Sequence, residues 1–71
     1  MEYDFNYDLY LDRQKESRKV RGSRIPLTGE RIFLDEQIYE IVNVATTFNS
    51  FEDRGRKVSI EDKINVYAKK L

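Results

Sequence analysis

Residues 3 to 12 alternate between apolar and polar side chains with a period of two. Such alternation is typical of a β-strand with one buried face, because successive side chains of a strand point to opposite sides. The apolar positions are rich in aromatic residues, which favour strands, and the opposite positions are polar and mostly acidic apart from Tyr10. The pattern predicts a strand whose buried face carries Tyr3, Phe5, Tyr7, Leu9 and Leu11.

The middle of the chain predicts two further strands. Pro26 and Gly29 supply turn chemistry before a short apolar segment, 31–34, which we expect to be a strand. Residues 35–37 form the next turn, and a longer strand follows over 38–47. Apolar residues occur at both odd and even positions of this longer strand, so it is either covered on both faces or interrupted by a bulge.

The last third of the chain permits two interpretations. Residues 49–57 form a predicted polar loop in which Gly55 can adopt a positive φ and Phe51 is the apolar exception. Residues 58–68 then read as two strands around a turn at 61–63. The same region also reads as a C-terminal helix over 60–71. We favour strands, because the preceding elements are strands and a small sheet needs its edge covered.

These elements predict an all-β fold for a single domain spanning residues 1–71. The expected architecture is a small antiparallel sheet or a partly closed, SH3-like barrel of four to five strands. A C-terminal helix over 60–71 would instead make the fold α+β. The expected core residues are Tyr3, Phe5, Tyr7, Leu9, Leu11, Ile32, Leu34, Ile38, Val42, Val44, Ile64 and Val66.

Charge is arranged in blocks although it sums to zero over the chain. The stretch RQKESRKVRGSR at 13–24 contains six cations and one acid, and we interpret it as a long loop. The loop either binds phosphate groups, matches an acidic protein surface, or is neutralised by acids of its own chain at Asp4, Asp8, Asp12 or within 30–40. Its cations are Arg13, Lys15, Arg18, Lys19, Arg21 and Arg24.

The residue inventory excludes most catalytic chemistry. The chain has neither histidine nor cysteine, so Ser-His and Cys-His dyads and the usual zinc and haem ligand sets are missing. Adjacent acids fall in predicted turns without a calcium-loop spacing. We therefore expect no enzyme activity and no cofactor. The N-terminus carries no long apolar run, which predicts a cytoplasmic protein without a membrane span.

Three motifs follow one another along the chain: IPxxGExIxL at 25–34, YxIxxV at 39–44 and IxVY at 64–67. With the N-terminal strand and the charged loop, their order resembles the small SH3-like β barrels found among short bacteriophage proteins. The resemblance implies a phage product that acts in the host cytoplasm by binding a host protein or serves in the virion.

The resulting hypothesis is a non-catalytic module that binds, and thereby inhibits, another protein. Its binding residues would be the cations of 13–24 for charge matching, with Tyr10 and Phe51 as aromatic anchors. Nucleic-acid binding through 13–24 is the first alternative. The second is a small structural or self-assembling protein, including a homodimer formed through an edge strand.

Overall fold

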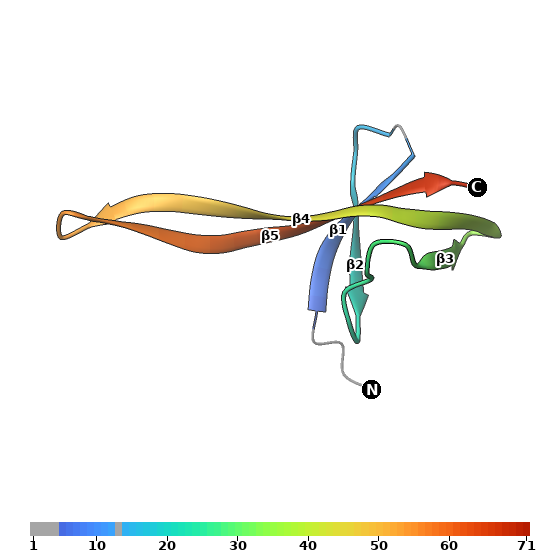
Figure 1. The fold of residues 1–71 in the computed structure, drawn as a ribbon, viewed down its shortest axis with the longest axis horizontal. Coiled ribbons are helices and arrows are strands. Elements are labelled where there is room, and N and C mark those ends of the chain that lie inside the picture. The colour runs from blue at the N-terminus through green and yellow to red at the C-terminus, as the bar shows by residue number, and fades with distance from the viewer. Residues whose placement is uncertain (1–4, 13) are drawn as a thin grey trace.

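The fold is known from a computed structural model that describes residues 5–12 and 14–71. Tyr3, a predicted core residue, and Arg13, a predicted binding residue, lie outside this range. The described chain contains five strands and no helix, so the all-β prediction is confirmed (Figure 1). The helical alternative over 60–71 is wrong. The strands are β1 (Phe5–Leu11), β2 (Arg18–Gly22), β3 (Arg31–Leu34), β4 (Gln37–Asp53) and β5 (Arg56–Lys70).

The strands form one sheet in the order β2-β1-β5-β4-β3, curled into a half-barrel. Neighbouring strands are antiparallel with one exception, because β1 runs parallel to β5 where residues 8–11 pair with residues 65–68. The sheet is therefore mixed, whereas the sequence predicted an antiparallel one. No hairpin joins β1 to β5, so chain connectivity does not fix their relative direction, and the apolar faces of both strands are buried in this arrangement.

The core lies where β1, β4 and β5 meet. Its buried residues are Leu9, Leu11, Ile41, Val66 and Ala68. The sequence predicted three of these five and missed Ile41 and Ala68. Five more predicted residues are half-buried against the core, namely Tyr7, Ile32, Leu34, Val44 and Ile64.

Three predicted core residues are exposed instead. Val42 is 43% exposed because it is the extra residue of a β-bulge between Ile41 and Asn43. Ile38, 46% exposed, pairs with the exposed Phe33 on the outer face of the sheet. Phe5, 42% exposed, lies on the part of β1 that no longer pairs with β5. The bulge confirms one of the two alternatives predicted for residues 38–47.

Two hairpins of the sheet turn through only two residues each. Asp35 and Glu36 join β3 to β4, and Arg54 and Gly55 join β4 to β5, all four with positive φ. Two successive positive φ values define a type I′ turn, whose twist matches that of the flanking strands. The positive φ predicted for Gly55 is confirmed at 78°.

Three segments predicted as loops or turns lie wholly or partly in strands. The polar segment 49–57 belongs to β4 and β5 except for its two turn residues, and the turn predicted at 61–63 lies within continuous β5. At that place Asp62 is the extra residue of a second bulge, between the pairs Thr47–Lys63 and Phe48–Glu61. In the basic stretch, residues 18–22 form β2, because β1 provides an antiparallel partner for them. Polar strands of this kind show no apolar alternation in sequence.

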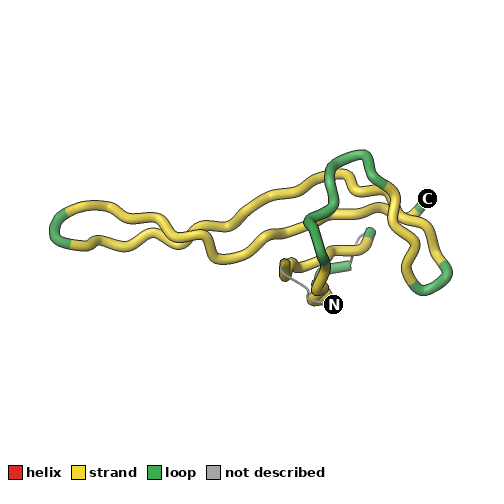
Figure 2. The backbone as a smooth tube through the Cα atoms, turned by 90° about the horizontal axis from the view of Figure 1, so that it is seen from below, coloured by secondary structure: helices red, strands yellow, loops and turns green. Residues whose placement is uncertain are grey.

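The β4–β5 hairpin extends well beyond the rest of the sheet (Figures 1 and 2). The described chain measures 50 × 32 × 20 Å, and the hairpin accounts for much of the longest dimension. We call the part from Phe48 to Glu61 the arm. It begins at the second bulge, where pairing resumes after a shift of one residue.

Candidate functional site

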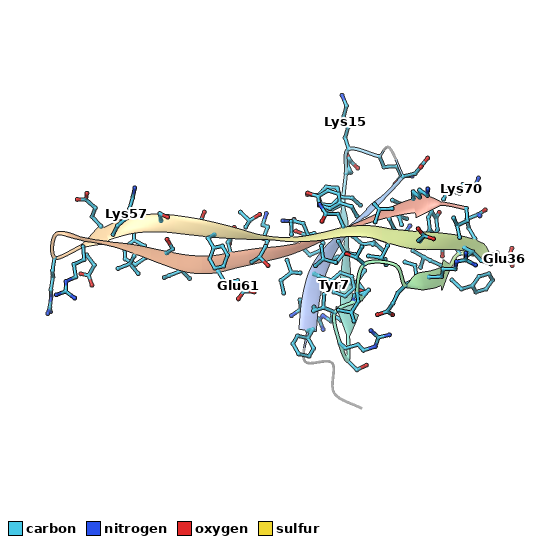
Figure 3. The ribbon with its side chains drawn as sticks, in the orientation of Figure 1. Tyr7, Lys15, Glu36, Lys57, Glu61 and Lys70 are labelled. Carbon is cyan, nitrogen blue, oxygen red and sulfur yellow. The ribbon has the colours of Figure 1, made fainter. Side chains whose placement is uncertain are left out.

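The arm exposes apolar side chains on both of its faces (Figure 3). Directly opposed residues of an antiparallel pair share a face, so Phe51, Val58 and Ile60 lie on one face and Phe48 lies on the other. The exposed fractions are 45% for Phe51, 53% for Ile60 and 57% for Phe48. Surface residues of this size gathered on one projecting element are typical of a binding surface.

Both edges of the arm lack a neighbouring strand among residues 5–12 and 14–71. On one side β1 pairs with β5 only over 65–68, and on the other β3 pairs with β4 only over 37–40. Within the arm the two strands are joined by the antiparallel ladder and by a 3.0 Å hydrogen bond between the hydroxyls of Ser50 and Ser59. Isolated two-stranded hairpins are only marginally stable in water, so this element gains most from an added partner.

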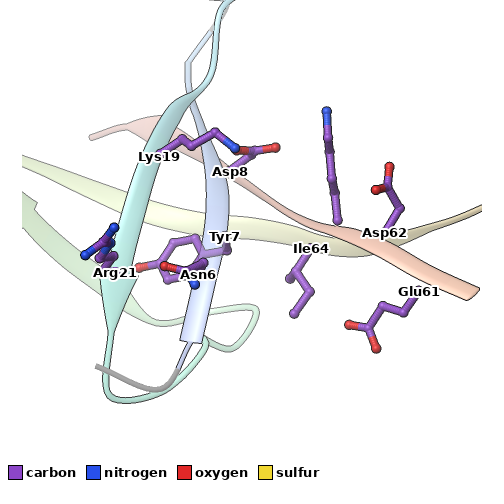
Figure 4. A pocket seen from close by; sticks show the side chains of 9 residues that line it. Asn6, Tyr7, Asp8, Lys19, Arg21, Glu61, Asp62 and Ile64 are labelled. Carbon is purple, nitrogen blue, oxygen red and sulfur yellow. The ribbon is translucent and has the colours of Figure 1, made fainter. Parts of the chain in front are cut away.

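A cleft opens where β1 diverges from β5 at the base of the arm (Figure 4). It has a volume of about 720 Å³ and carries charges of both signs. Asp8 at its wall is only 6% exposed and lies 3.8 Å from the ammonium group of Lys19. The residues that line the cleft are Asn6, Tyr7, Asp8, Lys19, Arg21, Glu61, Asp62, Lys63 and Ile64.

Three of the five described cations of the basic stretch form ion pairs within the chain. Arg18 contacts Asp35 at 2.9 Å, Lys19 contacts Asp8 at 3.8 Å, and Arg24 contacts Glu30 at 2.6 Å. Lys15 and Arg21 have no such partner in the part of the chain that the structure describes. Internal neutralisation by Asp8 and the segment 30–40 was one of the sequence interpretations, and these contacts match it.

The Arg24–Glu30 pair is the strongest of these contacts. Both terminal guanidinium nitrogens of Arg24 donate to the two carboxylate oxygens of Glu30 at 2.6 Å, and the Leu27 backbone N–H donates at 2.9 Å. First Arg24 and then the Leu27 N–H lower the pKa of Glu30 from 4.5 to about 2. The pair lies in the loop between β2 and β3, which is joined to β4 by two backbone hydrogen bonds: the Ile41 N–H donates to the Glu30 carbonyl, and the Gly29 N–H donates to the Ile41 carbonyl.

The two aromatic residues singled out from the sequence lie on different parts of the fold. Tyr10 stacks on Tyr67, its partner in the parallel β1–β5 register, with ring centroids 4.9 Å apart and planes inclined by 15°. Tyr10 is thus packed on a cross-strand neighbour. Phe51 lies on the arm, away from the basic stretch.

Sequence reasoning did not find Phe48 and Ile60, the other exposed apolar residues of the arm. Phe48 lay between the predicted strand 38–47 and the predicted loop 49–57, and Ile60 was expected in a short strand before a turn at 61–63. The available signal was the Arg54-Gly55 pair flanked by two strand-like segments, since a glycine at the second position of a two-residue loop favours a hairpin.

The described residues contain no group of three or more acidic side chains placed to hold a metal ion. They also contain no buried side-chain polar atom without a hydrogen-bond partner; for example, Asn65 donates to Thr47 at 2.8 Å. No helix within 5–12 and 14–71 is long and apolar enough to cross a membrane. Comparison of the chain with protein-family models, curated proteins and solved structures gave no match.

Proposed function

We propose that this protein is a non-catalytic module that binds another protein through its arm. The observation that carries the proposal is the geometry of residues 48–61, a projecting hairpin with apolar residues on both faces and no strand along either edge among the described residues. An extended segment of a partner can add to such an edge by backbone hydrogen bonds, while pockets between alternate side chains give specificity.

Apolar contacts support the same role. Phe51 and Ile60 lie on one face of the arm and are each about half exposed, at 45% and 53%. Large aromatic side chains are enriched among the residues that dominate binding energies. The resemblance to small phage barrels adds the expectation that the partner is a host protein and that binding inhibits it by occupying its surface.

The ion pairs of the basic stretch favour protein binding over nucleic-acid binding. Arg18, Lys19 and Arg24 each contact an acid of the same chain, so part of the positive charge available to phosphates is already balanced. Three acids and three cations line the cleft, so it offers no net positive charge to a phosphate backbone.

Site-specific photocrosslinking tests the proposal. A benzophenone amino acid is placed at Phe51 on the arm or, as matched control, at Phe33, an exposed aromatic residue of β3 that is 73% accessible. After irradiation in the producing cells, Phe51 should capture a distinct protein that Phe33 does not. Excess unmodified protein should compete for the capture, whereas a Phe51→Ser competitor should fail. Identical adducts from both positions would refute the proposal.

A further inference from the structure

The outer edge of the arm carries a sequence that is complementary to itself. Over 56–62 β5 reads RKVSIED, with two cations before the uncharged centre 58–60 and two acids after it. In an antiparallel pair of identical strands centred on Ser59, each residue faces the one equally far from the centre. Lys57 of each copy therefore faces Glu61 of the other.

We propose that β5 binds β5 of a second copy of this chain in an antiparallel, two-fold ladder centred on Ser59. The ladder runs from Lys57 to Glu61 and ends beside Asp62, the extra residue of the bulge. Val58 and Ile60 face each other across it. The inference rests on the proposed role of the arm as the binding element and names the first partner of that element.

Charge favours this register over those centred nearer to Lys63. If the ladder is centred on Ile60 instead, Lys57 of one copy faces Lys63 of the other. If it is centred midway between Ser59 and Ile60, Arg56 faces Lys63. Like charges directly opposite one another destabilise a sheet. With Ser59 at the centre, Lys57 instead faces Glu61, and Arg56 lies toward Asp62 at the end of the ladder. The edge of β4 offers no such match, because residues 43–53 contain acids and no cation.

The side chains already paired within the arm extend the charge complementarity across three strands. In the order β4-β5-β5-β4, one row reads Glu52, Lys57, Glu61 of the second copy and Phe48 of the second copy, so acid and base alternate over the first three strands. The central row places the bonded Ser50 and Ser59 hydroxyls beside the same pair of the second copy. The sheet face that carries Phe51 becomes a continuous apolar stripe across both copies.

The cleft gives the second arm room to approach. The β5 edge has no partner strand until Asn65 among the described residues, and the cleft lies along Glu61 to Ile64. In the ladder centred on Ser59, the Arg54–Gly55 turn of the second copy lies opposite Lys63 and Ile64, at the mouth of the cleft.

Charge-reversal variants test the ladder by sedimentation velocity and native mass spectrometry. The wild-type protein should form a dimer whose fraction rises with concentration and falls with salt. Lys57→Glu and Glu61→Lys each place like charges opposite one another twice, and each should raise the dimer dissociation constant by about tenfold or more. Lys15→Glu, an equal charge change on an exposed loop, should leave it unchanged.

Mixing gives the decisive result. Lys57→Glu mixed with ¹⁵N-labelled Glu61→Lys restores both opposite-charge contacts, so a heterodimer should form at concentrations where each variant alone is monomeric. Arm distortion in one variant cannot produce this rescue. A monomeric wild-type protein, or a dimer indifferent to both reversals and to mixing, would overturn the inference. The proposed function is tested by a separate experiment, because it predicts that Phe51 crosslinks to a protein other than this chain.

Discussion

Replacing isoleucine by valine at two positions of the long hairpin separates the core from the arm. Ile41 in β4 is 0% exposed and belongs to the core, whereas Ile60 in β5 is 53% exposed and belongs to the arm. Ile41→Val and Ile60→Val remove the same methylene group and keep a β-branched side chain, so strand propensity hardly changes. A difference between the two variants therefore reports burial.

The expected magnitudes follow from exposure. At Ile41 no solvent can replace the lost group, and the variant should lower the free energy of unfolding by about 0.5–1.5 kcal/mol. Ile60 is about half exposed, so Ile60→Val should lose about half of the transfer free energy of one methylene group. That transfer free energy is about 0.8 kcal/mol, so unfolding should become easier by about 0.4 kcal/mol, and no cavity forms. A protein of 71 residues typically has about 4–10 kcal/mol of stability in total, so both variants should remain folded.

Urea unfolding followed by circular dichroism measures both effects. With a slope of about 1 kcal/mol per molar urea, Ile41→Val should move the midpoint by about 0.5–1.5 M and Ile60→Val by about 0.4 M or less. The protein must be dilute enough to be monomeric, because self-association adds stability through mass action. An Ile60→Val effect equal to or larger than that of Ile41→Val in the monomer would refute the assignment of the core.

Two further predictions concern contacts outside the arm. Because the pKa of Glu30 is lowered from 4.5 to about 2 in the folded protein, its carboxylate stabilises the fold above pH 4.5, and this contribution is lost as the pH falls through about 2. Glu30→Gln should therefore lower the midpoint of thermal unfolding at pH 7 and have little effect near pH 2; an equal drop at both pH values would contradict this origin. A double-mutant cycle with Tyr10→Val and Tyr67→Val should give a coupling of about 0.5–1.5 kcal/mol in urea unfolding, and additive effects would show that the stacking contributes nothing.

The elements that the sequence predicts well are those with a buried face. The segment from Phe5 to Leu11 alternates because one side of β1 lies on the core, and the strand 31–34 was found with its observed bounds. The pairing of β1 with β5 was not predictable in direction, because no turn joins the two strands. Ile41 was missed because it is followed by Val42, and alternation does not show which of two adjacent apolar residues a bulge turns outward.

The candidate site was predicted least well, for a related reason. Residues 48–61 form strands without a buried face, so their polar residues match the pattern of a loop. Phe51 was predicted to be an aromatic anchor, but within a loop and not on a strand. Part of the basic stretch was likewise taken for loop, although Val20 packs against the core within β2. Which acid pairs with each cation depends on the sheet order, which the sequence does not reveal.

Because β1 pairs with β5, the core can form only after β5 is available. Leu9 pairs with Val66, 57 positions later in the chain (66 − 9), so the core requires a contact between segments that are far apart in sequence. The β4–β5 hairpin needs only local contacts and forms on a timescale of about 1–10 μs, whereas closing the sheet around a long loop is slower. During synthesis β1 and β2 therefore cannot complete the core until β5 has been made, whereas β4 and β5 can already pair with each other.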